Sequence, residues 1–307
     1  MNLVLPMGKL EAEALQRVGA DGRLYEIRTR RLEGGYVSAG VYRVDLIMKM
    51  PGGVFQEVSF VQKYTLPQEL HVHQALNDQV AHTSIPRIVD SGVFEGQTWF
   101  IYPYYAGEAL SWDDPVPKEL LHMMAQVHWR FEGREDEFSE VLRVDRPFLL
   151  HCFDSGLTSL ATQGELFYQE LALLKQIRED EQVYSVLKSL PMTLTHGDVH
   201  PGNLIRAGVE QAMLIDWGNA RFAPAALDLA NMVDFGSPEW KDYLAAWEGE
   251  SGLKMDERQA ELGFCLAEIV VNTQYLPFAV EHLPSEDARR MVMKSTAAWE
   301  GIEQLLA

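Results

Sequence analysis

The chain has 307 residues, 47% of them hydrophobic, which is enough to bury one large core or two of ordinary size. Its 45 acidic and 26 basic side chains give a formal net charge of −19, which disfavours binding to nucleic acids and anionic membranes and attracts cations. The sequence has no run of 18 apolar residues and no secretory signal pattern, so we expect a soluble protein that does not bind membranes.

Strand-like runs dominate the first hundred residues. Segments 24–35, 40–50 and 54–64 are strand-like runs, and a Pro-Gly-Gly turn separates the last two. A helix is predicted from Leu66 to Asn77 with Pro67 in its first turn, followed by strands near 85–94 and 97–105. This order predicts a five-stranded antiparallel sheet with one helix, forming an N-terminal lobe over residues 1–103.

The remainder of the chain, residues 104–307, is predicted to be a larger and mainly helical lobe. Apolar residues recur at helical spacing in segments 118–129, 165–177, 258–276 and 297–307. Two short strand-like runs interrupt the helices, at 192–195 and 212–215. Each of these runs leads to a carboxylate, Asp198 and Asp216 respectively.

The two cysteines, Cys152 and Cys265, lie far apart in the sequence. A pair so widely separated resembles neither a disulfide framework nor a metal-binding cluster. We interpret both as buried thiols and expect a cytoplasmic location.

Three polar residues have the spacing of a phosphoryl-transfer centre. Asp198 and Asn203 lie five positions apart in the segment HGDVHPGN, and Asp216 follows thirteen positions later. Phosphoryl transfer needs a carboxylate to orient and deprotonate the attacking hydroxyl, and oxygen ligands that hold Mg²⁺ against the nucleotide phosphates. The three side chains supply these groups in that order.

The motifs HGDVHPGN, IDWGNA and ALDLA, in this order, resemble those of the aminoglycoside phosphotransferase and choline kinase family, which are relatives of protein kinases. The resemblance covers nearly the whole chain. It implies a bilobal, protein-kinase-like α+β fold, with ATP (or alternatively GTP) and Mg²⁺ as cofactors. It also implies that Asp198 is the catalytic base and that Asn203 and Asp216 are metal ligands. Asp228 would tie down the catalytic loop by hydrogen bonds, and His196 would brace it from behind.

A literal Asp-Phe-Gly triplet at Asp234 to Gly236 is a competing candidate for the metal-binding aspartate. Its segment has helical rather than strand periodicity, and it lies 31 positions after Asn203 instead of 13. We therefore expect Asp216 to be the ligand.

A glycine-rich segment, LEGGYVSAGVY, joins the first two predicted strands. Backbone without Cβ atoms at Gly34, Gly35 and Gly40 could lie close over phosphates, and Ser38 could donate a hydrogen bond to the β-phosphate. Glycines that only shape a hairpin turn are the alternative.

Lys63 lies in the third predicted strand, on the same face as Val61 and Ser59. The resemblance implies that this lysine binds the α- and β-phosphates and pairs with a glutamate on the next helix. Glu69 is the only glutamate between Lys63 and Glu95. Stabilisation of the helix dipole is the competing role for Glu69.

The segment WFIYPYYAGEAL resembles the strand and hinge that hold adenine in kinases, with Tyr102 at the gatekeeper position. Adenine needs a backbone carbonyl and, two residues later, a backbone N–H. Pro103 keeps its carbonyl and lacks only its N–H, so Pro103 can accept and Tyr105 can donate. An edge strand broken by proline is the alternative.

Only twelve positions separate Asp216 from Asp228, which leaves little room for a peptide-binding platform and favours a small-molecule acceptor. The acidic composition favours a cationic one, with acidity that only maintains solubility as the alternative. The predicted helix 258–276 carries a polar stripe, which could contact the acceptor or could be an ordinary solvated face. The candidate acceptor contacts are this stripe and one earlier acidic residue: Glu261, Glu268, Asn272, Tyr275 and Asp154.

The sequence as a whole predicts an ATP-dependent O-phosphotransferase that transfers the γ-phosphate to a hydroxyl of a small cationic molecule, of the aminoglycoside phosphotransferase type. A choline, homoserine or other metabolite kinase is the first alternative. A non-catalytic, nucleotide-binding pseudokinase is the second. The presence of Lys63, Asp198, Asn203 and Asp216 together disfavours the pseudokinase.

Overall fold

A computed structural model of the chain describes residues 3, 5–32, 40–80, 82–206 and 212–307. It divides into two compact units. The first unit comprises Met1–Trp112 with Pro201–Asn219, and the second comprises Asp113–His200 with Ala220–Ala307. The lobe boundary expected between residues 103 and 104 stays a prediction.

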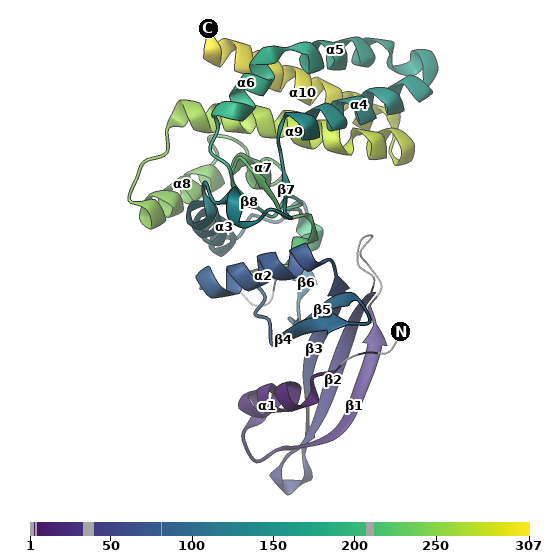
Figure 1. Ribbon diagram of the computed structural model, residues 1–307, viewed down its shortest axis with the longest axis vertical. Coiled ribbons are helices and arrows are strands. Elements are labelled where there is room, and N and C mark those ends of the chain that lie inside the picture. Colours follow the sequence, from purple (N-terminus) through teal and green to yellow (C-terminus); the bar gives the residue numbers. More distant parts are fainter. Residues whose placement is uncertain (1–2, 4, 33–39, 81, 207–211) are drawn as a thin grey trace. The chain divides into compact units, whose positions relative to one another are not determined.

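A five-stranded antiparallel sheet dominates the first unit and confirms the predicted sheet (Figure 1). Its strands are β1 (Arg23–Arg31), β2 (Gly40–Lys49), β3 (Phe55–Thr65), β4 (Asp90–Phe94) and β5 (Gln97–Pro103), in the spatial order β1-β2-β3-β5-β4. Gly52 and Gly53 both have positive φ, as the tight turn between β2 and β3 requires. Pairing of β3 with β5 then places Lys63 opposite Phe100 near the middle of the sheet.

Two helices accompany this sheet, one of which was predicted. Helix α2 (Pro67–Gln79) corresponds to the predicted helix, whereas α1 (Met7–Val18) was not expected. In α1, Leu10 and Ala14 lie one turn apart and are fully buried in the core formed with β2 and β3. Leu15 and Val18 pack against the same core, so the apolar residues of α1 recur at helical spacing on the face toward the sheet.

A second, three-stranded sheet completes the first unit. It consists of β6 (Glu108–Ala109), β9 (Leu204–Arg206) and β10 (Ala212–Leu214), in the order β10-β9-β6. The run predicted at 212–215 is β10. Strands β6 and β9 were not predicted, because two or three residues show no period, and pairing with neighbours defines them.

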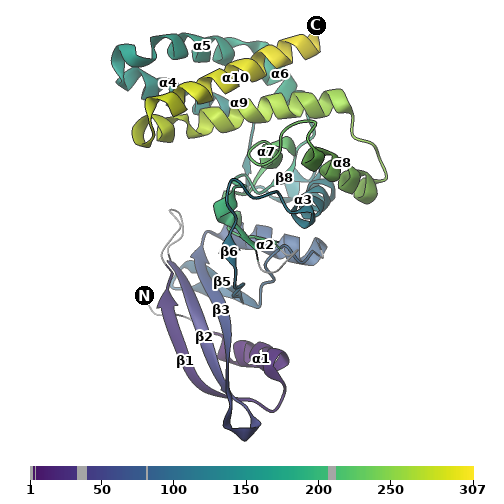
Figure 2. The ribbon, with the colours of Figure 1, turned by 180° about the vertical axis from the view of Figure 1, so that it is seen from behind.

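The second unit is mainly helical, as predicted. Its helices are α3 (Lys118–Phe131), α4 (Arg146–Thr162), α5 (Tyr168–Glu179), α6 (Glu181–Ser189), α7 (Ala226–Leu229), α8 (Pro238–Ser251), α9 (Glu257–His282) and α10 (Ser285–Leu306). The four predicted segments correspond to α3, α5, α9 and α10. Helices α9 and α10 lie side by side, and α4, α5 and α6 pack against this pair (Figures 1 and 2).

In the part of the chain that the structure describes, α9 is the one helix long and apolar enough to cross a membrane. Within its most apolar stretch, 56% of the residues are buried inside the protein. Helices α4, α6, α7 and α10 contact it. A buried core helix can have the same length and composition as a membrane span. The length and composition of α9 alone therefore do not indicate that it crosses a membrane.

A small sheet in the second unit leads into the predicted catalytic loop. Strand β11 (Arg221–Ala223) pairs in parallel with β7 (Leu142–Arg143) and antiparallel with β8 (Thr193–Thr195). The Thr195 hydroxyl also donates a hydrogen bond to the Arg221 carbonyl (2.9 Å). These contacts fix the end of β8, which immediately precedes the segment His196 to Asp198.

The two cysteines are free thiols, with Cys152 buried and Cys265 half-buried. Burial raises the pKa of each thiol to about 11. Both are therefore protonated at neutral pH and are poor nucleophiles, in agreement with their interpretation as core residues.

Candidate active site

A short hairpin in the first unit brings Asn203 and Asp216 together. Leu204 of β9 is paired with Leu214 of β10, and the Ile215 N–H donates to the Asn203 carbonyl (2.9 Å). Asn203 directly precedes β9, and only Ile215 separates the end of β10 from Asp216. Both residues therefore lie at the same end of the hairpin. The thirteen-residue spacing seen in the sequence is the length of this hairpin.

Asp216 has a left-handed backbone conformation, with φ of 65°. Few residues other than glycine adopt this region, although aspartate tolerates it better than most. The next residue, Trp217, is buried, and its indole N–H donates to the Leu214 carbonyl (3.2 Å). The buried indole therefore holds the turn in which Asp216 leaves the strand.

Lys63 forms the centre of an ionic cluster in the first unit. Its Nζ lies 2.6 Å from Glu69 Oε1 and 2.6 Å from Asp216 Oδ1. The Thr65 hydroxyl donates a short hydrogen bond to the other oxygen of Glu69. The predicted pair of Lys63 and Glu69 is confirmed, and the contact with Asp216 joins residues 153 positions apart.

The environment of Lys63 keeps its ammonium charged. Burial alone would lower the pKa of Lys63, but the neighbouring carboxylates of Glu69 and Asp216 raise it above its ordinary value. Only 7% of the Lys63 side chain is exposed, so its charge is little screened by water. Such a lysine acts as a fixed positive charge for an anionic ligand.

The residues around Asp216 fit a magnesium ion. The Asp216 side chain is 43% exposed even though it contacts Lys63. A Cβ at position 218 would lie 3.2 Å from Asp216 Oδ1 and 3.4 Å from Glu69 Oε2, so Gly218 leaves space beside both carboxylates. Carboxylate and amide oxygens are hard ligands of the kind that Mg²⁺ prefers, usually completed by water and phosphate. Among the described residues, no group of three or more His, Cys, Asp or Glu side chains forms a metal site of another type.

In the second unit, Asp228 holds the backbone that precedes Asp198. Its carboxylate accepts hydrogen bonds from the N–H groups of His196 (2.7 Å) and Gly197 (2.8 Å), and it lies 3.2 Å from His128 Nε2. Gly197 has φ of 76°, so this turn favours glycine. The predicted role of Asp228 in tying down the loop is confirmed. His196 is fully buried, and its bracing role stays a prediction.

Replacing Asp228 with alanine is expected to destabilise the protein by about 3–5 kcal/mol, because it leaves the buried donors around it without an acceptor. Denaturant unfolding at neutral pH measures this loss. Asp234→Ala, an exposed position six residues later, is the matched control. Equal stability of the two variants would contradict the role of Asp228.

The same carboxylate contributes a pH dependence. Burial would raise the pKa of Asp228, but the hydrogen bond from His128 and those from the loop hold it below its ordinary value. Its stabilisation is therefore complete above the unfolded pKa of about 3.9 and is lost as the pH falls through the lower, folded pKa.

Asp198 itself receives a hydrogen bond from helix α9. The Tyr275 hydroxyl donates to Asp198 Oδ1 (2.7 Å), and His200 Nε2 lies 3.9 Å from Asp198 Oδ2. Burial and this hydrogen bond raise the pKa of Tyr275, so it stays a protonated donor at neutral pH. Tyr275, expected among the acceptor contacts, thus reaches the carboxylate predicted to be the base.

Arg221 was not predicted from the sequence. Its guanidinium is buried in the second unit and donates to the Gln274 side chain (2.8 Å). Burial lowers the pKa of Arg221, and the nearby Tyr275, Asp228 and Asp198 offset only part of this effect. An arginine five positions after Asp216 was the only available signal, and it has no pattern that distinguishes it from a surface residue.

The other candidates for acceptor binding have different surroundings. The buried Asn272 side chain donates to Glu268 Oε2 (2.8 Å), so an ordinary solvated face is wrong for this part of the stripe. Glu261 and Glu268 are half-buried. Asp154 lies on α4 and pairs with Arg178 of α5 (2.7 Å), with 56% of its side chain exposed, and none of its observed contacts joins it to Asp198 or Tyr275.

The predicted adenine-binding segment ends strand β5. Pro103 is the last residue of β5, and the next N–H, of Tyr104, donates to the Ser59 carbonyl (2.9 Å). The Tyr105 ring stacks on Tyr102, with centroids 6.5 Å apart. Because β5 lies between β3 and β4, the alternative of a broken edge strand is wrong.

Two predicted phosphate-binding residues, Gly35 and Ser38, lie outside the described residues, as does Gly34. Gly40, expected in the same turn, is the first residue of β2. The competing aspartate, Asp234, is exposed in a turn before α8, and its carbonyl accepts a hydrogen bond from the Ser237 N–H (3.1 Å). Asp216, and not Asp234, contacts the lysine of the ionic cluster.

The chain matches one family model and is similar in fold to several solved structures. A family model described as the phosphotransferase enzyme family matches residues 59–262, more than half of the chain. A search of curated protein sequences found no match. Among solved structures, a spectinomycin phosphotransferase in complex with ADP and spectinomycin is 15% identical, with a TM-score of 0.57 over 98% of this chain and 97% of that chain.

Two further structures are similar. A wild-type aminoglycoside 2'-phosphotransferase-IIIa in complex with GDP is 15% identical, with a TM-score of 0.55 over 94% of this chain and 98% of that chain. An ethanolamine kinase from Plasmodium vivax is 15% identical, with a TM-score of 0.51 over 89% and 81%. Identities this low show the fold alone, which is the protein-kinase-like α+β fold that the motifs implied. The family match adds the activity class, and the chain therefore belongs to the phosphotransferase enzyme family as a small-molecule kinase.

Proposed function

We propose that the protein transfers the γ-phosphate of ATP to a hydroxyl of a small cationic molecule. The observation that carries the proposal is the buried Lys63, held between Glu69 and Asp216 at 2.6 Å from each carboxylate. A fixed cation beside an exposed carboxylate is suited to bind the phosphates of a magnesium nucleotide. Asp198 lies five residues before Asn203, and five residues of fully extended chain span at most about 18 Å. The backbone of the proposed base is therefore within this distance of the backbone of the proposed metal ligand.

Each residue has one role in this proposal. Asp198 accepts the proton of the attacking hydroxyl, and Tyr275 orients the Asp198 carboxylate through its hydrogen bond. Asn203 and Asp216 would hold Mg²⁺. When bound, this ion neutralises charge on the phosphates of the nucleotide. Lys63 binds the α- and β-phosphates.

The nucleotide is assigned to the segment that ends β5. The Pro103 carbonyl and the Tyr105 N–H would contact adenine, and Gly35 and Ser38 would contact phosphates. Among the similar structures, the spectinomycin phosphotransferase binds ADP and the aminoglycoside 2'-phosphotransferase binds GDP, so GTP is the alternative donor. Calorimetry with ATP and with GTP distinguishes the two donors.

Two further properties stay predictions. One is the cytoplasmic location, and the other is the boundary between the two lobes after residue 103.

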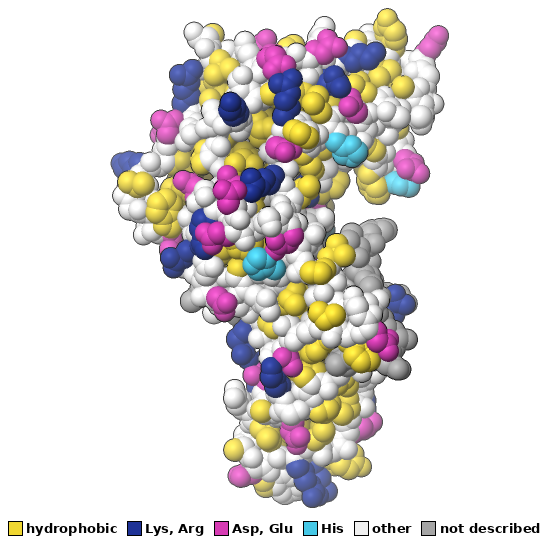
Figure 3. All heavy atoms as spheres, viewed as in Figure 1, with side chains coloured by type: hydrophobic (Ala, Val, Ile, Leu, Met, Phe, Trp, Pro, Cys, Tyr) yellow, Lys and Arg dark blue, Asp and Glu magenta, His cyan; other side chains and the backbone are white. Residues whose placement is uncertain are grey.

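The acceptor is proposed to be cationic because the chain carries a net charge of −19. On the face drawn in Figure 3, acidic side chains are scattered among lysines and arginines rather than gathered in one patch. Long-range attraction of a cationic acceptor would therefore come from the summed electrostatic field of all the charges rather than from one acidic patch. The acceptors named for similar proteins, spectinomycin and ethanolamine, also contain amino groups, which supports this class.

A screen for acceptor-dependent ADP release tests the proposal. The panel should contain aminoglycosides, spectinomycin, choline, ethanolamine, homoserine and a neutral macrolide sugar, each with and without Mg²⁺. We expect turnover with an amino-bearing alcohol and none without Mg²⁺. Turnover confined to neutral or anionic acceptors would contradict the cationic assignment, but not the kinase activity.

The KM for the acceptor is expected to rise steeply with ionic strength while kcat changes little. Attraction between an acidic protein and a cation weakens as the Debye length falls from about 10 Å at 0.1 M salt to about 3 Å at 1 M. Steady-state kinetics over this range measure the effect. A KM that does not change with salt would mean that the net charge serves solubility alone.

A variant of Glu268 provides a local version of this test. Glu268→Gln removes one negative charge from α9 and keeps the size of the side chain. It should raise KM for a polycationic acceptor more than for a neutral one. Glu281→Gln, at an exposed position of α9 that is not among the candidate acceptor contacts, is the matched control.

A further inference from the structure

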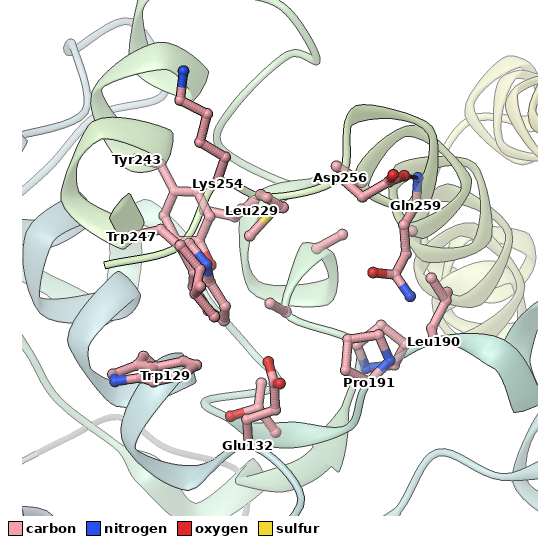
Figure 4. Close-up of a pocket in the computed structure, with 18 of the residues that line it drawn as sticks. Trp129, Glu132, Leu190, Pro191, Leu229, Tyr243, Trp247, Lys254, Asp256 and Gln259 are labelled. Atoms are coloured by element: carbon pink, nitrogen blue, oxygen red, sulfur yellow. Dashed lines mark hydrogen bonds between the residues drawn. The ribbon is translucent and has the colours of Figure 1, made fainter. Parts of the chain in front are cut away.

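The second unit contains a cavity of about 270 Å³ that the proposed reaction does not use. Its walls come from α3, α7 and the residues before it, α8, the loop before α9, the start of α9 and the segment that leads into β8 (Figure 4). Asp198 and Tyr275 are not among the residues that line it. Its volume lies just below the range of about 300–1,000 Å³ that is common for ligand pockets, so the cavity suits only a very small molecule.

Aromatic rings form one side of the cavity. The rings of Trp129 and Trp247 have centroids 5.8 Å apart and planes at 78°, and the Tyr243 ring lies 6.4 Å from Trp247 at 39°. The two tryptophan rings are therefore nearly perpendicular, and all three aromatic side chains line the cavity. The face of an aromatic ring attracts a cation through its quadrupole, and tryptophan does so most strongly.

A carboxylate completes the cavity. Figure 4 shows the Glu132 carboxylate and the Gln259 amide entering the cavity from different sides, whereas the Lys254 ammonium extends away from Glu132. Glu132 is half-buried, and burial raises its pKa. Among the residues that the structure describes, none is seen to form a hydrogen bond or ion pair with the Glu132 side chain. A half-buried carboxylate of this kind favours a cationic partner.

We propose that this cavity binds a small organic cation, whose ammonium group contacts Trp129 and Trp247 and pairs with Glu132. The site is separate from the acceptor site of the proposed function and does not depend on that function. An apolar neutral molecule would use the aromatic walls but would leave the carboxylate without a partner. The charge of the ligand is therefore what the experiment must resolve.

The probe is tetramethylammonium, which has no hydroxyl and cannot be phosphorylated. Its binding to the full-length protein can be followed by calorimetry and by tryptophan fluorescence, with tert-butyl methyl ether as a neutral molecule of similar size. We expect saturable binding of the cation, weaker binding of the ether, and a loss of affinity for the cation of roughly twofold to thirtyfold in Trp129→Leu. Glu132→Gln should also weaken binding of the cation, because it removes the paired negative charge.

Two controls separate this site from others. Asp198→Asn should leave tetramethylammonium binding unchanged, and a loss in that variant would place the cation at the acceptor site and overturn the proposal. Equal affinity for cation and ether, or equal affinity in wild type, Glu132→Gln and Trp129→Leu, would also overturn it. Tyr243 is left intact, because its hydroxyl lies 2.9 Å from His128 Nδ1 and so adjoins the contacts that hold the catalytic loop.

Discussion

Replacing Asp198 with asparagine is expected to lower kcat by about 10²- to 10⁴-fold while leaving the affinity for magnesium ATP nearly unchanged. The carboxylate acts on the acceptor hydroxyl, so its loss affects proton transfer more than nucleotide binding. Asparagine has the same size, and its carbonyl oxygen can still accept the hydrogen bond from Tyr275. Steady-state kinetics give the loss of turnover, and calorimetry gives the nucleotide affinity.

Tyr275→Phe is the informative comparison, because it removes the hydroxyl and keeps both Asp198 and the ring. If Tyr275 only positions the carboxylate, its removal should reduce kcat much less than removal of the carboxylate itself. Full turnover by Asp198→Asn on the true acceptor would show that Asp198 is not the base. A loss in Tyr275→Phe as large as in Asp198→Asn would assign the proton transfer to both residues jointly.

The second large effect is expected at Asp216. Asp216→Ala should weaken the binding of magnesium ATP by at least about tenfold, since it removes a charged metal ligand beside the phosphates. Lys63 keeps its contact with Glu69 at 2.6 Å, so the ionic cluster is not left without a carboxylate. Calorimetry with ATP at increasing magnesium concentration should show that much of the lost affinity depends on the metal.

Asp234→Ala is the matched control for this prediction. Asp234 precedes Phe235 and Gly236 in a triplet that resembles a kinase metal motif, but it is exposed in a turn. Its replacement should leave nucleotide affinity at the wild-type value. Unchanged affinity in Asp216→Ala together with a loss in Asp234→Ala would show that the metal ligand had been assigned to the wrong aspartate.

The parts of the fold with long, regular patterns were predictable from the sequence. Strands β2 and β3 have ten and eleven residues, and α2 begins with a proline in its first turn. By contrast, α1 was missed although Leu10, Ala14 and Val18 recur at helical spacing in its twelve residues. Strands of two or three residues, such as β6 and β9, have too few residues for any period.

In the candidate site, residues close in sequence were easier to predict than distant contacts. The spacing of Asn203 and Asp216 reflects one hairpin, so it could be read directly from the sequence. The contacts of Lys63 with Asp216 and of Tyr275 with Asp198 join residues 153 and 77 positions apart. Only the tertiary structure fixes such contacts. Tyr275 could be placed on a polar stripe, but its partner could not be inferred.

The most direct test of the central claim is to follow the γ-phosphate of ATP labelled with ¹⁸O during turnover with the best acceptor. Mass spectrometry would identify which molecule carries the label. We predict that the label appears on the acceptor in an amount equal to the ADP released, and that both signals fall together in Asp198→Asn. Label found only in inorganic phosphate, or label transfer that persists unchanged in Asp198→Asn, would contradict phosphoryl transfer by this centre.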